Sequence, residues 1–277
     1  MSEKITVQQI LSLKGKRKST MLTAYDYPLG SLVDQAGIDM VLVGDSLANV
    51  VLGLDSTTKV GMNEMLIFAK AVTRGVKNAM VIGDMPYESY QTNPQESVKN
   101  AKRFIEEAKC DAVKLEWFDR CPEVTQAIIK AGIPVVGHIG LTPQTADKIG
   151  GFKVQGKDAQ AAQRLIDQAI ELEKFGCFAI VLECVPDKIA ELITKKLKIL
   201  TIGIGAGPNC DGQVLVIHDA IGLFQRYTPK FVKKYIDLSP MILEAVKNYR
   251  DEVISGKFPA AEHTFSIKKE ELEKLEK

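Results

Sequence analysis

Short apolar runs recur along this chain, and each one leads directly into ionisable or polar residues. The runs are MVLV, AMVIG, DAVKL, IPVVG and FAIVL. The residues at their ends are Asp45 with Ser46, Asp84, Lys114 with Glu116, His138, and Glu183. Runs this short and rich in Val, Ile and Leu are typical of buried parallel strands. In a barrel the carboxyl ends of such strands meet in one mouth, so the pattern predicts an enzyme with its chemistry there.

Strand and helix patterns alternate along almost the whole chain. A first short helix within residues 6–16 ends near Gly15, and helical stretches follow most of the strands. The predicted strands span residues 20–24, 40–44, 80–83, 112–115, 134–137, 178–182, 199–204 and 214–217. Eight such strands favour an α/β fold, a (β/α)8 TIM barrel, with an open doubly wound sheet as the alternative. We expect one barrel domain over residues 1–277, with 267–277 a charged tail.

Composition excludes several classes of protein. The chain has 277 residues, 45% of them hydrophobic, and a formal net charge of +1, so nothing favours nucleic acid or an anionic membrane as a partner. The start lacks the apolar core of a signal peptide, and no run approaches the roughly 20 apolar residues of a membrane span. The five cysteines are scattered without a C-x-x-C pair, which indicates free thiols in a reducing cytoplasm.

The run that ends in Glu116 predicts which side chains face the barrel axis. Because side chains alternate along a strand, Val113 and Leu115 share one face while Lys114 and Glu116 share the other. The apolar pair should pack under the outer helices, which leaves the ionisable pair in the interior. A buried Lys–Glu pair contributes little net stability, so we favour a functional role over polar packing.

Four carboxylates are predicted to reach the same pocket: Asp45, Asp84, Glu116 and Glu183. Two carboxylates about 4 Å apart repel by roughly 4 kcal/mol at an effective dielectric of 20, and one Lys cannot offset several such terms. Either some of the acids are protonated or a divalent cation lies among them. Oxygen ligands without cysteine indicate Mg²⁺ or a similar hard ion. For a single Asp, the alternative is an N-cap of the helix that follows its strand.

Three further features leave alternatives open. Glu183 follows a very apolar strand, so it is either a partly desolvated general base or a salt-bridge partner. His138 is a substrate hydrogen-bond donor, a ligand or a packed core histidine. The stretch TIGIGAGPNCDGQ either cradles a phosphate with backbone N–H groups or makes a tight turn, and it matches neither a Walker A loop nor the dinucleotide fingerprint.

Together, long segments of the chain resemble the ketopantoate hydroxymethyltransferase family. They run from about Met21 to Gly222 and are MLTAYDYPLGSLVDQAGIDMVLVGDSLANVVLG, DAVKLE, GHIGLTPQ, GGFKVQG, VLECVP and GIGAGPNCDGQVLVIHDAIG. The resemblance implies a barrel of the phosphoenolpyruvate-binding superfamily and a homo-oligomer, often a decamer. It also implies Mg²⁺ and transfer of a hydroxymethyl group from 5,10-methylenetetrahydrofolate to 2-oxoisovalerate, through an enolate, in pantothenate biosynthesis.

The resemblance also implies a role for each residue at the predicted mouth. Asp45 and Asp84 look like Mg²⁺ ligands, with Glu116 completing the site directly or through water. Ser46 and Lys114 look like contacts to the carboxylate and keto oxygen of the substrate, which His138 also adjoins, and Glu183 looks like the proton acceptor.

The chain departs from the family pattern in two places beside the mouth. It has DMPYESY, with Tyr87 and Glu88, where D-L-P-F-G-S-Y is expected. After KLE it has Trp117 and Phe118, where Gly-Gly is usual. Neither change touches a proposed ligand, but both bear on the folate pocket or its lid.

Three other functions remain compatible with the residues. A carbon–carbon lyase of the same superfamily would share the barrel, the Mg²⁺ carboxylates and an enolate. A Schiff-base aldolase would use Lys114 as its nucleophile and need no metal. A non-catalytic barrel would bind a metabolite without turnover.

Overall fold

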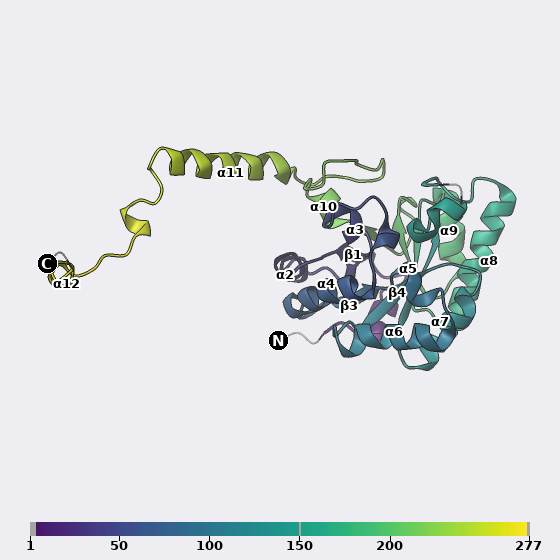
Figure 1. Cartoon of the computed structure of the whole chain (residues 1–277). Coiled ribbons are helices and arrows are strands. Elements are labelled where there is room, and N and C mark those ends of the chain that lie inside the picture. Colours follow the sequence, from purple (N-terminus) through teal and green to yellow (C-terminus); the bar gives the residue numbers. More distant parts are fainter. Residues whose placement is uncertain (1–3, 150, 276–277) are drawn as a thin grey trace.

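A computed structural model describes residues 4–149 and 151–275 of the chain, and in them eight parallel strands close into a barrel (Figure 1). The strands, each hydrogen-bonded to the next, are β1 (Ser19–Thr23), β2 (Met40–Val43), β3 (Met80–Asp84), β4 (Ala112–Glu116), β5 (Val135–Gly140), β6 (Ala179–Glu183), β7 (Leu200–Ile204) and β8 (Gly212–Leu215). Strand β8 pairs with β1, which closes the ring. The predicted (β/α)8 barrel is confirmed, and the open sheet is excluded.

Two strands differ from the prediction by more than one residue at an end, whereas the other six differ by one residue at one or both ends. Strand β5 continues to Gly140, three residues beyond the predicted end, because its pairing with β6 runs on as far as Gly140 opposite Glu183. His138 therefore lies inside the strand and not after it. Strand β8 begins at Gly212, where it pairs with Ser19 of β1, and ends at Leu215.

Helices surround most of the barrel. They are α1 (Val7–Leu11), α2 (Tyr27–Gln35), α3 (Leu47–Val50), α4 (Met62–Gly75), α5 (Tyr87–Tyr90), α6 (Pro94–Glu106), α7 (Cys121–Lys130), α8 (Ala159–Phe175), α9 (Asp187–Lys196), α10 (Ile217–Ala220), α11 (Leu238–Ile254) and α12 (Lys269–Leu272), with short 3-10 turns η1 (Thr57–Lys59), η2 (Pro143–Ile149) and η3 (Ala261–His263). The expected boundary signals are present: Asp158 caps α8 through the N–H of Ala161, and Gly176 ends it with φ 101°. None of the described helices is long and apolar enough to cross a membrane.

The apolar core has two layers. Inside the barrel, Met40, Met80 and Ile202 pack together, and Ile10 of α1 joins them from below. Outside it, the other face of the strands packs against the helices, and Val113 and Leu115 belong to this outer layer. Their neighbours Lys114 and Glu116 are buried on the inner side, so the predicted alternation along β4 is confirmed.

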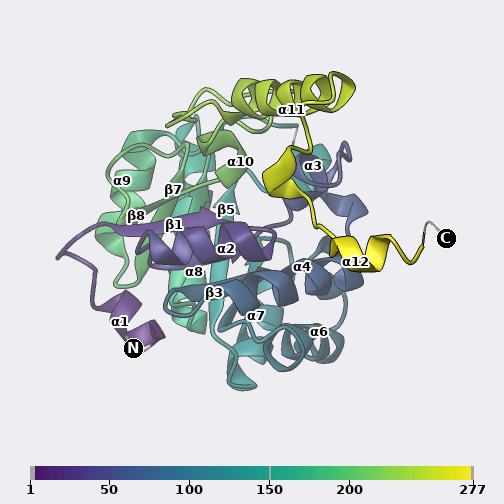
Figure 2. The same cartoon turned by 90° about the vertical axis from the view of Figure 1, so that its left-hand side faces the viewer.

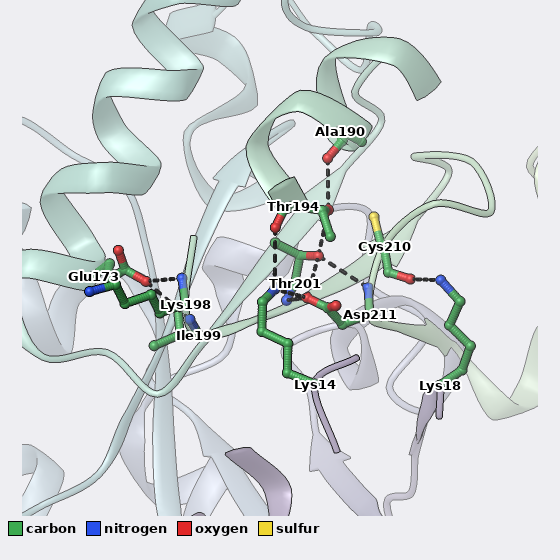
Figure 3. A network of polar contacts seen from close by, with 10 residues as sticks. All are labelled: Lys14, Lys18, Glu173, Ala190, Thr194, Lys198, Ile199, Thr201, Cys210 and Asp211. Carbon is green, nitrogen blue, oxygen red and sulfur yellow. Dashed lines mark hydrogen bonds and ion pairs between the residues drawn. The ribbon is translucent and has the colours of Figure 1, made fainter. Parts of the chain in front are cut away.

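A polar network closes the amino-terminal end of the barrel (Figure 3). Asp211 Oδ2 accepts hydrogen bonds from Lys14 Nζ at 2.6 Å and from the backbone N–H of Thr201 at 2.9 Å. Glu173 likewise accepts from the backbone N–H groups of Lys198 and Ile199. Each of these carboxylates accepts two or more hydrogen bonds, as expected for groups that stabilise the fold.

The chain leaves the barrel after α10, as an arm formed by residues 222–275. Figure 1 shows the arm extending away from the barrel, and Figure 2 views the barrel from the side to which the arm extends. Helix α11 has no buried residue. Where a helix would cover β8 and β1, Gln213 and Thr20 are exposed, whereas β2 to β7 are buried along almost their whole length. The described part of the predicted tail, 267–275, is exposed; residues 276–277 lie outside the described residues.

Candidate active site

The predicted polar residues meet in a cavity of about 470 Å³ at the carboxyl ends of the strands. Asp84 and Glu183 are the last residues of β3 and β6, and Asp45 with Ser46 follows β2. Lys114 and His138 reach the same cavity from inside β4 and β5. The prediction that these strand ends share one mouth is confirmed.

Asp84 lies at the centre of one half of the site. Its Oδ1 is 2.8 Å from Lys114 Nζ, with both side chains almost fully buried. Its Oδ2 accepts the backbone N–H of Asp45 at 3.0 Å. The short β2–α3 connection thus holds Asp45 beside Asp84, and Ser46 Oγ lies 2.7 Å from the hydroxyl of Tyr25.

His138 joins the other carboxylates. Its Nε2 lies 3.2 Å from Glu183 Oε2 and its Nδ1 lies 3.5 Å from Glu116 Oε1. Lys114 Nζ is 3.4 Å from the same Nδ1. His138 is thus placed between two carboxylates. Glu116 is fully buried behind the residues that line the cavity, whereas the Glu183 side chain is 17% exposed.

The sequence did not predict Gln144, which lies in η2 and forms hydrogen bonds with both Asp45 and Glu116. Its Nε2 donates to Asp45 Oδ2 at 3.0 Å, its Oε1 accepts from Tyr90 at 2.6 Å, and its backbone N–H donates to Glu116 Oε2 at 3.0 Å. Gln144 is 4% exposed. The segment GHIGLTPQ contains it, but only the fold reveals that a residue of the β5 connection reaches both Asp45 and Glu116.

Burial raises the pKa values of two carboxylates of the mouth. Burial, with repulsion from Asp45, raises the pKa of Asp84 to about 7 although Lys114 opposes the change. Burial also raises the pKa of Glu116 above its usual range. At the opposite end of the barrel, Asp39 is buried as well, but hydrogen bonds from Arg17 and Thr20 hold its pKa below the usual value. At Asp84 and Glu116 the compensating partners do not outweigh burial, which is typical of a functional site.

The sequence of the whole chain agrees with this site. Residues 4–261 match the sequence profile of ketopantoate hydroxymethyltransferase. The chain belongs to the ketopantoate hydroxymethyltransferase family. A curated relative from Syntrophomonas wolfei subsp. wolfei, named 3-methyl-2-oxobutanoate hydroxymethyltransferase, is 56% identical over 262 residues, 95% of each chain. A relative of the same name from Syntrophobacter fumaroxidans is 55% identical and covers 99% of this chain and 98% of its own.

Solved structures with the same fold have other reactions. Phosphoenolpyruvate phosphomutase from Streptomyces platensis subsp. rosaceus is similar with a TM-score of 0.61 and 14% identity, covering 95% of this chain and 92% of its own. 2,3-Dimethylmalate lyase, described as a member of the PEP mutase/isocitrate lyase superfamily, gives 0.59 and 13%, covering 93% and 91%. This likeness shows the fold alone. Membership of the ketopantoate hydroxymethyltransferase family makes the chain a hydroxymethyltransferase, so the lyase and the non-catalytic barrel are no longer needed.

The surroundings of Lys114 argue against a Schiff-base mechanism. Burial alone would lower its pKa, but Asp84, Asp45 and Glu116 outweigh burial and raise the pKa above the usual value for lysine. An amine must be unprotonated to attack a carbonyl group. Lys114 is therefore held as an ammonium ion that binds anions and is a poor nucleophile.

Among residues 4–149 and 151–275, no group of three or more His, Cys, Asp or Glu side chains is arranged to hold a metal ion. The site nevertheless fits Mg²⁺, which usually binds one or two carboxylates and completes its shell with substrate and water. Apart from the ion pair with Lys114, the buried Asp84 Oδ1 has no hydrogen-bond partner, and Glu116 Oε1 accepts none. Buried carboxylate oxygens with so few partners, beside Asp45, match the donor set of a hard cation.

The residues that depart from the family pattern are not among the described residues that line the mouth cavity. Trp117 and Phe118 line a separate cavity of about 860 Å³, and Phe118 packs edge-on against Tyr90. Tyr87 and Glu88 lie in α5.

The glycines of the β7–β8 loop have a conformational cause. Gly205 and Gly207 have φ values of 63° and 80°, and a Cβ at Gly207 would lie 2.6 Å from Asp187 Cβ. The tight-turn interpretation accounts for these two glycines. The five cysteines are free, as predicted.

Proposed function

We propose that this protein transfers the hydroxymethyl group from 5,10-methylenetetrahydrofolate to 2-oxoisovalerate, with Mg²⁺ as cofactor, as a step of pantothenate biosynthesis. The main support is that four carboxylates, those of Asp45, Asp84, Glu116 and Glu183, cluster around two cationic side chains. These two are Lys114 and His138. Such an excess of buried negative charge favours a bound cation and a separate base. The names of the relatives supply the acceptor, 3-methyl-2-oxobutanoate, which is 2-oxoisovalerate.

Asp45 and Asp84 would hold Mg²⁺, with Glu116 completing the site directly or through water. When bound, the cation would withdraw electron density from the oxygens of the keto acid and acidify the hydrogen at C3. Lys114, an ammonium ion next to Asp84, and Ser46 would contact the carboxylate and keto oxygen. These contacts orient the keto acid with C3 toward the β6 side of the mouth.

Glu183 would remove the C3 proton, because it is the most accessible carboxylate of the cluster and is contacted by His138. Burial and Lys114 lower the pKa of His138, but Glu116 and Glu183 outweigh them and raise it to about 9. The ring therefore carries a charge, and its contact with Glu183 holds that carboxylate in place. C3 then forms a bond with the one-carbon unit, water supplies its hydroxyl group, and both bonds between that carbon and the folate nitrogens break. The proton taken from C3 and one proton of the water go to the two nitrogens. The products are 2-dehydropantoate and tetrahydrofolate.

Deuterium exchange tests the proposal at its first step. In D₂O with Mg²⁺ and without folate, the protein is expected to exchange the C3 hydrogen of 2-oxoisovalerate, observed by proton NMR. Glu183→Gln is expected to bind the keto acid but to lose exchange and turnover by a factor of about 10² to 10⁴, the usual contribution of a general base. A chelator is expected to abolish both.

The outcomes separate the possible errors. Exchange that persists in Glu183→Gln would assign the proton to another group. Turnover by chelated protein would remove the role of the cation. If wild-type protein forms 2-dehydropantoate but does not exchange in the absence of folate, the proposed order of steps is wrong.

We also propose that the protein is a cytoplasmic homo-oligomer in which a second copy covers helix α11 of the arm. Five free cysteines suit a reducing compartment. Helix α11 exposes Met241, Ile242, Leu243, Val246 and Tyr249, each between 46% and 59%. Exposed apolar surface on this scale marks an interface. The outer faces of β8 and β1, where Gln213 and Thr20 are exposed, lack a covering helix, so a second copy's α11 suits that place. A monomeric mass by light scattering would refute assembly, and a tenfold mass would identify the decamer.

A further inference from the structure

The outer half of the mouth cavity is aromatic, in contrast to its ionisable floor. Phe152, Phe224, Tyr227 and Phe231 line it from two segments far apart in the sequence. Phe152 is 71% exposed and Tyr227 70%, although both belong to the cavity wall. We call these four residues the aromatic rim. Large exposed rings around a concave site indicate a ligand with a flat apolar surface.

Contacts to other loops hold the rim in position. Arg226 Nη1, next to Tyr227, donates to the carbonyl of Gly53 at 3.0 Å, which links the rim to the loop after α3. Phe231 packs on Gly205, where a Cβ would lie only 2.7 Å from the ring. The arrangement is therefore specified on both sides of Tyr227, because a larger residue at Gly205 would displace Phe231.

A buried carboxylate lies in the same cavity beyond the metal-site residues. Asp219 of α10 lines the cavity and is 7% exposed. Ionised, a carboxylate accepts two parallel hydrogen bonds, such as those of an aminopyrimidine edge with adjacent N–H donors. The mechanism of proton removal gives Asp219 no part.

The cavity is also larger than the keto acid requires. Its volume of about 470 Å³ lies in the range of pockets that bury drug-sized ligands, whereas 2-oxoisovalerate has only five carbons. With the keto acid bound to Lys114 and Ser46 on the floor, the space under the rim remains for a second, aromatic molecule. That molecule would lie directly above C3.

We propose that the aromatic rim and Asp219 form the binding site for the pteridine and benzoyl rings of the folate co-substrate. Phe152 and Tyr227 stack on the rings, and Asp219 accepts from the aminopyrimidine edge. The inference rests on the proposed function, since it assigns the place of the one-carbon donor in that reaction. It makes the rim a determinant of folate affinity with no part in proton removal.

A matched pair of tyrosines tests the proposal in the full-length protein. Tyr227→Ala is expected to raise KM for 5,10-methylenetetrahydrofolate about tenfold, the loss of one stacking contact, with KM for 2-oxoisovalerate unchanged. Tyr235→Ala is the control, because Tyr235 is 71% exposed in the same segment but contacts Lys233. Asp219→Asn is expected to weaken tetrahydrofolate binding in equilibrium dialysis by a similar factor.

Folate-free deuterium exchange distinguishes a failure of the proposed folate site from a failure of the proposed function. If Tyr227→Ala exchanges at the wild-type rate and binds tetrahydrofolate weakly, the proposal is supported. Equal folate KM values for Tyr227→Ala and Tyr235→Ala would overturn the rim site while leaving the proposed function intact. Wild-type protein that neither exchanges nor forms 2-dehydropantoate would overturn the proposed function itself.

Discussion

Gln144 offers the sharpest test of how this site is built. Gln144→Leu removes an amide that contacts the Asp45 carboxylate, the carbonyl of Met85 and the hydroxyl of Tyr90, at 3.0, 3.2 and 2.6 Å. All three partners are buried. Each buried group left without a partner costs about 1–3 kcal/mol, so the free energy of unfolding is expected to fall by about 3 kcal/mol or more. Because Asp45 loses its support, Mg²⁺ affinity is expected to fall about 10- to 100-fold.

Urea unfolding and the Mg²⁺ dependence of deuterium exchange measure the two effects separately. Gln163→Leu is the matched control, because Gln163 Nε2 also donates to an Asp carboxylate, Asp167, at 2.8 Å, but on the exposed surface of α8. That change is expected to cost no more than about 0.5 kcal/mol. Equal losses in the two variants would refute the burial argument. A large loss of stability in Gln144→Leu with unchanged Mg²⁺ dependence would show that Gln144 does not position Asp45.

Three further predictions concern the charged groups of the mouth. Asp45→Ala is expected to abolish metal-dependent binding of 2-oxoisovalerate, and Asp45→Asn to give a milder defect; calorimetry with Mg²⁺ measures both. The pKa of His138 is raised from its ordinary value of 6.5 to about 9, so the stability it contributes is present below pH 6.5 and is lost as the pH rises through 9. His138→Gln is therefore expected to flatten the pH dependence of the unfolding free energy of metal-free protein across that window. Borohydride with substrate is expected to leave Lys114 unmodified in mass spectra, since its amine stays protonated.

The barrel was predictable because its signal is local. Each strand is short and buried on both faces, so it appears in the sequence as an apolar run, and a polar residue where the run ends already indicates the mouth. The alternation along β4 gave the inward face of Lys114 and Glu116 for the same reason. The resemblance of long segments to a known family then supplied roles that no spacing could give.

The rest depends on contacts between distant segments. Gln144 meets Asp45 across 99 positions in the sequence, and a glutamine in a polar loop carries no signal of that contact. Helix α11 has the length of a helix that covers a barrel, yet none of its residues is buried, and no local pattern says which surface it covers. The full burial of the Glu116 side chain behind His138 likewise depends on how distant segments pack together, so the sequence pattern does not predict it.

The two ends of the barrel show why the carboxylates of the mouth are better explained by ligands than by stability. At the amino-terminal end, Asp34 is buried, and burial alone would raise its pKa, yet the N–H groups of residues 77–79 lower it. At the carboxyl end, the pKa of Asp84 rises to about 7, because Lys114 does not outweigh burial and the neighbouring Asp45. The same fold can therefore satisfy a buried carboxylate with three backbone donors, whereas Asp84 at the mouth receives one, from Asp45. Uncompensated charge in this cavity lowers the stability of the ligand-free protein. A cation and a substrate that neutralise the charge therefore bind favourably and stabilise the folded state.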